Sequence, residues 1–292
     1  MNERTTLVTG GTGGIGAAVA VRLGAGGDRL LIAGRDQARG ARVLRDLAGA
    51  NPRVDHAHVP VDLSLMADTA RLADEVASRT SRLDAVVLCA GVFAGAAEWT
   101  SEGLERTFAL NYLSRFLLLS RLLPLVAAAP SGRVVLVANA GKYGDSLDLD
   151  AVLEGRAHPR RHLAAASQFA NDLLAVELAA RLAGTSVEVT CVFPGVVRTD
   201  VFRNARGVPA PLRWVARGVA RLVGSEVETA AETPARLAQD PTVGSNGGFY
   251  GPGLRPIEVP RRAADPGRRQ ELWEVSRVLL RPWLSASAEV AS

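Results

Sequence analysis

The stretch Thr9-Gly10-Gly11-Thr12-Gly13-Gly14-Ile15-Gly16 decides the fold of this chain. It follows an apolar run at residues 5–9 and opens a helical pattern at residues 15–24. Glycines suit such a junction because the chain turns tightly, because backbone must approach a pyrophosphate, and because the helix packs close to the strand. The free N–H groups at the start of the helix then face the phosphates. The stretch therefore predicts a dinucleotide site, with contacts from Gly10, Thr12, Gly13, Gly14, Ile15 and Gly16.

The same alternation of strand and helix patterns continues along the chain. Strand patterns occupy residues 30–33, 54–61, 83–89, 133–137 and 187–193, and helical patterns occupy residues 37–47, 66–79, 104–123 and 163–182. Strands that are apolar throughout, such as Ala85-Val86-Val87-Leu88, indicate burial on both faces. This predicts an α/β fold, a doubly wound parallel sheet of the Rossmann type. We expect one reductase domain over residues 1–283, with a small helical substrate lid at about 200–225 and a disordered tail at 284–292.

Composition narrows the class of protein. The 292 residues, 48% of them hydrophobic, can build one large α/β core, and a net charge of +4 from scattered bases gives no case for nucleic acid. Two cysteines, Cys89 and Cys191, are too few for a disulfide framework, and no Cys/His spacing predicts a metal site. The amino terminus lacks a secretory pattern, which predicts a cytoplasmic protein. The most apolar stretch, residues 116–129, contains Arg121 and Pro124 and is shorter than the roughly 20 residues of a membrane span.

The ends of the second and third strands suggest how the adenosine half is bound. Arg35 would pair with a 2′-phosphate, whereas Asp36 would suit a free 2′-hydroxyl. We favour Arg35 and hence NADPH, although Arg35 as a solvated residue opening the next helix is an alternative. Asp62, beside Leu63, is predicted to accept a hydrogen bond from the adenine amino group, or else to be the N-cap of the following helix.

These motifs resemble the short-chain dehydrogenase/reductase family, and more closely its retinol-dehydrogenase and protochlorophyllide-reductase-like branch, over about residues 4–283. Further matches are Cys89-Ala90-Gly91 in place of the family's Asn-Ala-Gly, Asn111 in the long helix, and Pro194-Gly195-Val196-Val197-Arg198-Thr199 after the sixth strand. In the family these positions line the nicotinamide half of the cofactor. The resemblance thus adds the following cofactor residues: Asp62, Leu63, Cys89, Ala90, Gly91, Asn111, Pro194, Gly195, Val197 and Thr199.

The family's catalytic groups are replaced in this chain. The pattern Tyr-x-x-Ser-Lys-x-Ala-Asn aligns with residues 164–171, so that Ala164 stands for the tyrosine and Gln168 for the lysine. The family's serine aligns with Asn139, which can polarise a carbonyl but cannot protonate it near neutral pH. No catalytic residue is therefore assigned. Tyr143, next to the only lysine, Lys142, is a weak stand-in, and plain exposure of both side chains is the simpler interpretation.

The substrate itself offers a proton source. If the ketone lies beside an acidic phenol of a polycyclic aromatic, the phenol can deliver the proton within the molecule. The chain is similar to reductases that tailor angucyclinone antibiotics, which implies substrate-assisted reduction of an aromatic polyketide ketone. Two alternatives stay open: a redox-inactive, cofactor-binding accessory subunit, and a non-redox cyclase or isomerase. The sequence does not predict an oligomeric state.

The segment at residues 209–223 would close over such a substrate. Leu212 and Val215 fall on one apolar helical face, opposite a row of arginines at four-residue spacing. The family resemblance implies a mobile lid here, with substrate contacts from Leu212, Trp214 and Val215. A basic amphipathic helix resting on a membrane surface is the alternative.

Overall fold

An eight-stranded sheet forms the centre of the protein. The computed structural model describes residues 3–93, 96–159, 162–197 and 226–284. The strand order is β3-β2-β1-β4-β5-β6-β7-β8, and every pair is parallel except β7 with β8. The strands are β1 (Thr5–Thr9), β2 (Arg29–Gly34), β3 (Ala57–Pro60), β4 (Ala85–Leu88), β5 (Gly132–Val137), β6 (Val187–Val192), β7 (Gly248–Tyr250) and β8 (Pro256–Ile257). The strand order reverses between β1 and β4, as in a doubly wound sheet. The predicted fold class is confirmed.

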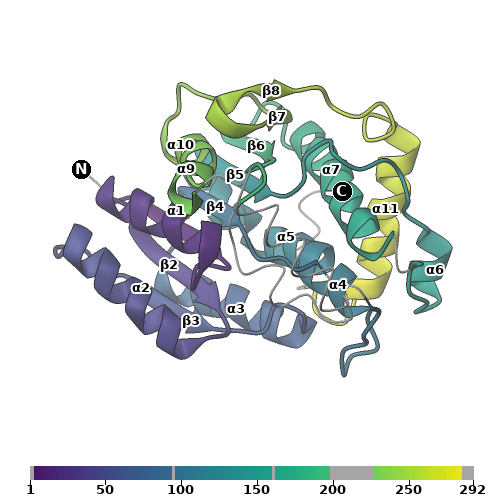
Figure 1. Cartoon of the computed structure of the whole chain (residues 1–292), viewed down its shortest axis with the longest axis horizontal. Helices are drawn as coiled ribbons and strands as arrows, with labels where there is room; N and C mark the ends of the chain where they lie inside the picture. Colours follow the sequence, from purple (N-terminus) through teal and green to yellow (C-terminus); the bar gives the residue numbers. More distant parts are fainter. Residues whose placement is uncertain (1–2, 94–95, 160–161, 198–225, 285–292) are drawn as a thin grey trace.

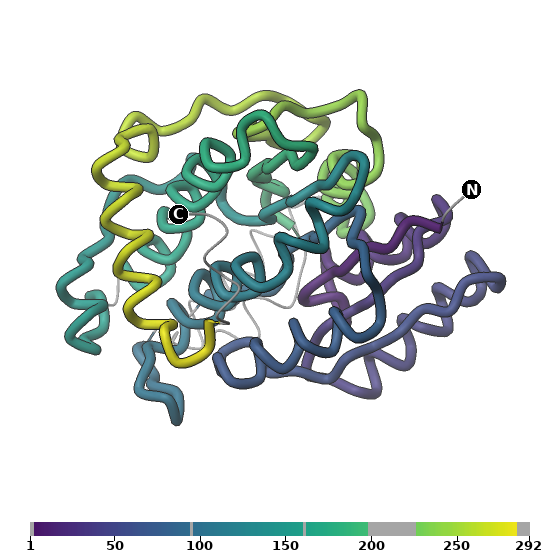
Figure 2. Tube along the Cα trace, turned by 180° about the vertical axis from the view of Figure 1, so that it is seen from behind, coloured from purple at the N-terminus to yellow at the C-terminus, as the bar shows by residue number. Residues whose placement is uncertain are grey.

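Helices cover both faces of the sheet (Figure 1). Successive residues of one strand enter different cores, because Leu7 belongs to the core on one face of the sheet and Val8 to the core on the other face. Figure 2 shows α11 running alongside α7. The helices are α1 (Gly14–Ala25), α2 (Gln37–Ala50), α3 (Met66–Arg79), α4 (Arg106–Phe108), the π-helix η1 (Ala109–Leu113), α5 (Ser114–Ala127), α6 (Leu149–Leu153), α7 (Leu163–Arg181), α9 (Val227–Ala230), α10 (Glu232–Gln239), the 3-10 helix η4 (Pro252–Leu254) and α11 (Pro266–Leu280). Because helices cover both faces of the sheet, a central strand such as β4 is apolar at every position.

The long central helix is longer than the sequence suggested. The run α4, η1 and α5 continues over Arg106–Ala127, 22 residues that are long and apolar enough to cross a membrane by length and composition alone. Within the fold, 72% of its most apolar window is buried. Arg121 does not interrupt it, because its guanidinium pairs with Asp74 and donates to the Trp283 carbonyl. Burial against the sheet accounts for its apolar character.

Several predictions fall outside the described residues. They concern Arg198, Thr199 and the predicted lid at about 200–225, with Leu212, Trp214 and Val215. They also concern the chain from residue 285 onward. The proposed lid and tail therefore stay predictions.

Candidate cofactor and active site

The glycine-rich turn leaves room only for backbone. Gly10 has a φ of +67°, and a Cβ there would lie 2.8 Å from the Ala90 nitrogen. A Cβ on Gly16 would lie 2.4 Å from the Gly10 carbonyl oxygen. These contacts explain why glycine is needed for α1 to approach the ends of β1 and β4.

The start of α1 is suited to a phosphate. Its N-cap, Gly13, makes no side-chain capping hydrogen bond, and the first turn holds no acidic residue. A Cβ on Gly13 would meet only the Arg39 Nη1 atom, at 3.7 Å, so its surroundings are open. Thr12 faces Gly34 at the end of β2, and Ile15 packs on the α1 core. Open backbone at a helix N-terminus fits the pyrophosphate of a dinucleotide.

Arg35 and Asp36 have different surroundings at the end of β2. The Asp36 carboxylate accepts a hydrogen bond from the Arg39 N–H at 2.9 Å and caps α2. The Arg35 side chain is 57% exposed, and its Nη1 lies 3.9 Å from the Asp62 Oδ2. The helix is therefore opened by Asp36, while Arg35 projects beyond the strand with room for an anionic partner.

Asp62 is not a helix N-cap, so that alternative is wrong. Helix α3 begins at Met66, and the Glu102 carboxylate, distant in sequence, accepts the Met66 and Ala67 N–H groups. Asp62 instead accepts from Ser64 through both its N–H and its hydroxyl, at 3.0 and 2.7 Å. Burial acts to raise the Asp62 pKa, but these bonds and the charges of Arg35 and Arg106 outweigh it, so the pKa lies below its usual value. Leu63 is buried in the core, which leaves only its backbone to face a ligand.

The segment after β4 forms the other end of the site. Asn111, fully buried in η1, accepts a hydrogen bond from the Val92 N–H at 2.8 Å and donates to the Val92 carbonyl and the Ser167 hydroxyl, both at 3.0 Å. It thus fixes the chain that follows Cys89-Ala90-Gly91, of which Gly91 is exposed. Burial raises the pKa of the Cys89 thiol to about 12, so it stays neutral.

The segment after β6 reaches the same end of the sheet. Pro194 and Gly195 are half-buried, Gly195 with a φ of +86°, and Val197 is buried. The predicted cofactor residues that are described therefore follow the carboxyl ends of β1, β2, β3, β4 and β6, except Asn111, which holds the segment after β4.

The three positions predicted to replace the catalytic groups lie together. The Gln168 Oε1 accepts the Asn139 backbone N–H at 3.0 Å, and Gln168 is buried. Ala164 and Ala165, one turn earlier on α7, are half-buried. Asn139 and Gln168 can orient a ligand, but neither amide releases a proton near neutral pH.

Tyr143 and Lys142 have separate surroundings. Tyr143 is half-buried, and burial raises its pKa, which makes it a weaker acid than in water. Lys142 is exposed, and its Nζ lies 4.9 Å from the centre of the Phe193 ring. This is a cation–π contact with the residue that precedes Pro194. The interpretation of Tyr143 as simply exposed is wrong, because its side chain is partly enclosed.

Two buried ionisable residues near the site were missed from the sequence. Arg115, 3% exposed, donates through Nη2 to the Ala90 and Val137 carbonyls, each at 2.9 Å, and through Nη1 to the Asn171 Oδ1 at 3.2 Å. Burial lowers its pKa to about 10. Its position one turn after Asn111 is the only signal that the sequence offers.

Asp172 is the second missed residue. Its Oδ2 accepts the Gly141 N–H at 3.1 Å, and its Oδ1 lies 3.8 Å from the Cys191 Sγ, which donates to it. Burial raises the Asp172 pKa to about 8. Asp172 follows Gln168 by one helical turn, so two side chains of α7 hold residues 139–141.

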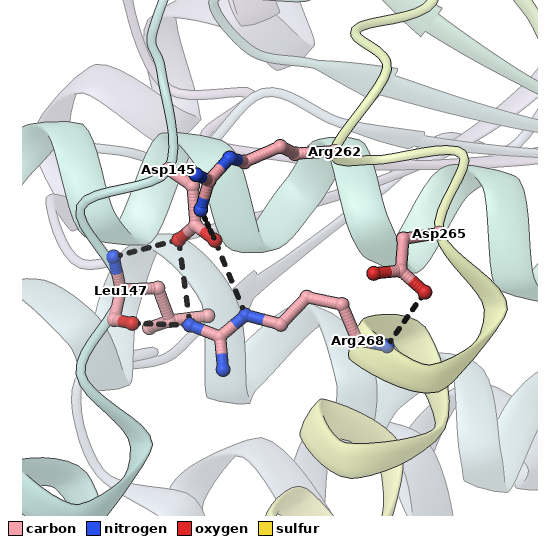
Figure 3. Close-up of a pocket in the computed structure, with 5 residues that line it drawn as sticks. All are labelled: Asp145, Leu147, Arg262, Asp265 and Arg268. Atoms are coloured by element: carbon pink, nitrogen blue, oxygen red, sulfur yellow. Dashed lines mark hydrogen bonds and ion pairs between the residues drawn. The ribbon is translucent and has the colours of Figure 1, made fainter.

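A separate hollow lies where the segment after Tyr143 meets the start of α11. It has a volume of about 460 Å³ and is lined by Asp145, Leu147, Arg262, Asp265 and Arg268 (Figure 3). Its charges pair with one another, because the Asp145 carboxylate lies 3.3 Å from the Arg268 Nε and 3.6 Å from the Arg262 Nη1. The hollow contains none of the predicted cofactor residues. Within the described ranges, no three His, Cys, Asp or Glu side chains are grouped to hold a metal ion.

Known proteins resemble the chain in sequence and fold. The model of the short chain dehydrogenase family matches residues 4–147. Human retinol dehydrogenase 14 is 30% identical over 294 residues, which cover 96% of this chain and 87% of the relative. The chain belongs to the short chain dehydrogenase family. This short chain dehydrogenase is therefore an oxidoreductase, as the motifs predicted, and its retinol dehydrogenase relatives agree with the predicted branch.

Two further similarities extend the comparison. The oxidoreductase calI of Penicillium decumbens is 30% identical over 278 residues, which cover 91% of this chain and 80% of calI. A solved short chain dehydrogenase from Shigella flexneri 2A str. 301, complexed with NADP, has a TM-score of 0.63 at 21% identity, covering 86% of this chain and 97% of that one. At 21% identity, the similarity to the Shigella flexneri structure shows a shared fold.

Proposed function

We propose that this short chain dehydrogenase is an NADPH-dependent ketoreductase that reduces a ketone of a phenolic polycyclic aromatic polyketide, of the angucyclinone type, in antibiotic biosynthesis. The observation that carries the proposal is the pairing of Gln168 with Asn139 beside Ala164. Both side chains of this pair are amides that can hydrogen-bond to a ligand but cannot release a proton near neutral pH, and Ala164 carries only a methyl group. In its most specific form, the proposal is that the enzyme reduces the C7 ketone of a simocyclinone-type angucyclinone.

NADPH is the proposed cofactor because of the end of β2. Asp36, which would bind a free 2′-hydroxyl, is engaged as the cap of α2, whereas the Arg35 guanidinium is mostly exposed. A planar guanidinium binds a 2′-phosphate through two parallel hydrogen bonds. The open backbone at the start of α1 also suits NADPH, because it can bind the pyrophosphate. A cytoplasmic location belongs to the same proposal.

In this mechanism the residues of the protein bind and orient the cofactor and the substrate. The cofactor supplies the hydride when bound. The turn at residues 10–16 holds the pyrophosphate, and the Asn139 amide donates a hydrogen bond to the substrate carbonyl oxygen. The proton comes from a phenol next to the ketone, whose high effective molarity replaces a protein acid worth about 10² to 10⁴ in rate. The small side chains of Ala164 and Ala165 leave room for a flat ring system.

The test uses purified protein, NADPH and a panel of aromatic ketones with a hydroxyl beside the carbonyl, each matched by its methyl ether. Nicotinamide absorbance and product analysis follow the reaction. We expect the free phenols to be reduced and the methyl ethers to react at least about 100-fold more slowly, the size of a lost general acid. Equal rates for both would overturn the proposed proton source.

The missing acid also suits a second candidate, an accessory subunit that binds cofactor without redox chemistry. Consumption of NADPH only after a partner protein is added would favour this role. Product formed without cofactor oxidation would favour a cyclase or isomerase.

A further inference from the structure

Arg115 is a buried cation at the predicted nicotinamide end of the site. Its guanidinium joins the ends of two central strands, because Nη2 donates to the carbonyls of Ala90, after β4, and Val137, the last residue of β5. Ala90 precedes the exposed Gly91, and a Cβ on Gly91 would lie 3.9 Å from the same Nη2. One hydrogen bond thus separates the charge from the segment that the family resemblance assigns to the nicotinamide.

No carboxylate pairs with this charge among the residues that the structure describes. The polar partners of Arg115 are two carbonyls and the Asn171 amide oxygen, and its Nε is buried without a partner. Buried charges are normally paired, since an isolated one is costly. Cys89 and Cys191, the ionisable groups that act on Arg115, are thiols with raised pKa values and stay neutral.

Among the described residues, the other side chains at this end do not neutralise the charge of Arg115. Gln168 is neutral, and Asp172 has a pKa raised by burial to about 8, so it keeps its proton at pH 7. Lys142 is exposed, where water and salt screen its charge. Arg115 therefore leaves a positive field in a poorly screened region.

We propose that Arg115 sets the oxidation-state preference of the cofactor site, so that the protein binds NADPH more tightly than NADP⁺. The oxidised nicotinamide ring carries a positive charge, and the reduced ring carries none. At a separation on the order of 10 Å and an effective dielectric constant of about 20, two like charges change a binding constant by about tenfold or more. The inference rests on the nicotinamide cofactor of the proposed function.

The test measures dissociation constants of NADPH and NADP⁺ by fluorescence and calorimetry. The wild-type protein should bind NADPH at least about tenfold more tightly, and Arg115→Met should reduce this ratio to about threefold or less, mainly through tighter NADP⁺ binding. Arg115→Lys, which keeps the charge, should retain most of the ratio. Arg121→Met is the matched control, because Arg121 lies on the same helix but pairs with Asp74. It should leave the ratio unchanged.

Further controls separate this role from simple support of the fold. ADP-ribose 2′-phosphate, a ligand that lacks nicotinamide, should bind wild type and Arg115→Met with equal affinity. If Arg115→Met lowered the affinity for NADPH, NADP⁺ and ADP-ribose 2′-phosphate by the same factor, the inference would be overturned, because Arg115 would then only support the fold. Raising the salt from about 0.05 to 0.5 M should leave the wild-type ratio within about twofold, since a buried charge is weakly screened. A ratio that collapses in salt would assign the effect to exposed charges.

The wild-type measurement keeps the inference testable even if the Arg115 variants do not fold. A wild-type ratio near one overturns the role of Arg115 but leaves the proposed reductase intact. Failure of both cofactors to bind would instead overturn the proposed function.

Discussion

Replacing Asp172 by Asn should change how the stability of the protein depends on pH. Asp172 is 1% exposed, and its pKa is raised from 3.8 to about 8 by burial. Between these values the folded protein holds a proton that the unfolded chain has lost. The free energy of unfolding therefore falls as pH rises, by about 1.4 kcal/mol per pH unit. The contribution of Asp172 to the free energy of unfolding is fully present below pH 3.8 and is lost as the pH rises to about 8.

The size of the effect follows from the same two values. A difference of about four pH units corresponds to a loss of about 6 kcal/mol between pH 4 and pH 8. Asn keeps an acceptor for the Gly141 N–H and cannot ionise. We expect Asp172→Asn to be more stable than wild type at pH 8 by several kcal/mol, and equal or slightly less stable near pH 4.

Urea unfolding followed by circular dichroism at pH 4 to 9 measures this difference. Asp46→Asn is the matched control, because Asp46 lies on the exposed face of α2. It should follow the wild-type curve. Stability curves of wild type and Asp172→Asn that stay parallel from pH 4 to 9 would refute this prediction, because Asp172 would then have the same pKa in the folded and unfolded protein.

The remaining predictions concern the cofactor turn and the active site. Arg35→Ala should weaken NADPH binding by about tenfold or more while leaving NADH within about twofold, since only NADPH offers the 2′-phosphate; an equal loss of both in calorimetry would contradict the choice of NADPH. Gly16→Ala should abolish measurable cofactor binding, or prevent folding as judged by circular dichroism, because its Cβ would lie 2.4 Å from the Gly10 oxygen. Retained binding would show that the turn can move. Tyr143→Phe should change the turnover number by less than about threefold; a loss of about 100-fold would make Tyr143 the acid and reject the substrate-supplied proton.

The sheet and the cofactor turn could be predicted because each depends on local pattern. A strand apolar at every position must be buried on both faces, and Val86 and Val87 of β4 do enter opposite cores. The glycines of the turn were predictable for a similar reason, since close backbone approach excludes every other residue. Such features need no knowledge of distant partners.

Other features depend on partners that are distant in the sequence. The alternative role of Asp62 as an N-cap was wrong because the carboxylate that meets the start of α3 belongs to Glu102, 36 residues from Met66. The sequence pattern does not show how the charge of Arg121 is accommodated in the central helix, because its partners are Asp74 and the Trp283 carbonyl. Arg115 was missed because backbone carbonyls, which no spacing rule reveals, are its main partners.

The hydrogen bond from the Asn139 N–H to Gln168 limits how this enzyme can be engineered. A designer who installs the family's tyrosine and lysine at residues 164 and 168 would exchange an acceptor for a side chain that only donates. The Asn139 N–H would then lose its partner, at a cost of about 1 to 3 kcal/mol if it stays buried. Conversion to conventional chemistry therefore requires a third, compensating substitution, which makes simple two-site grafts unpromising.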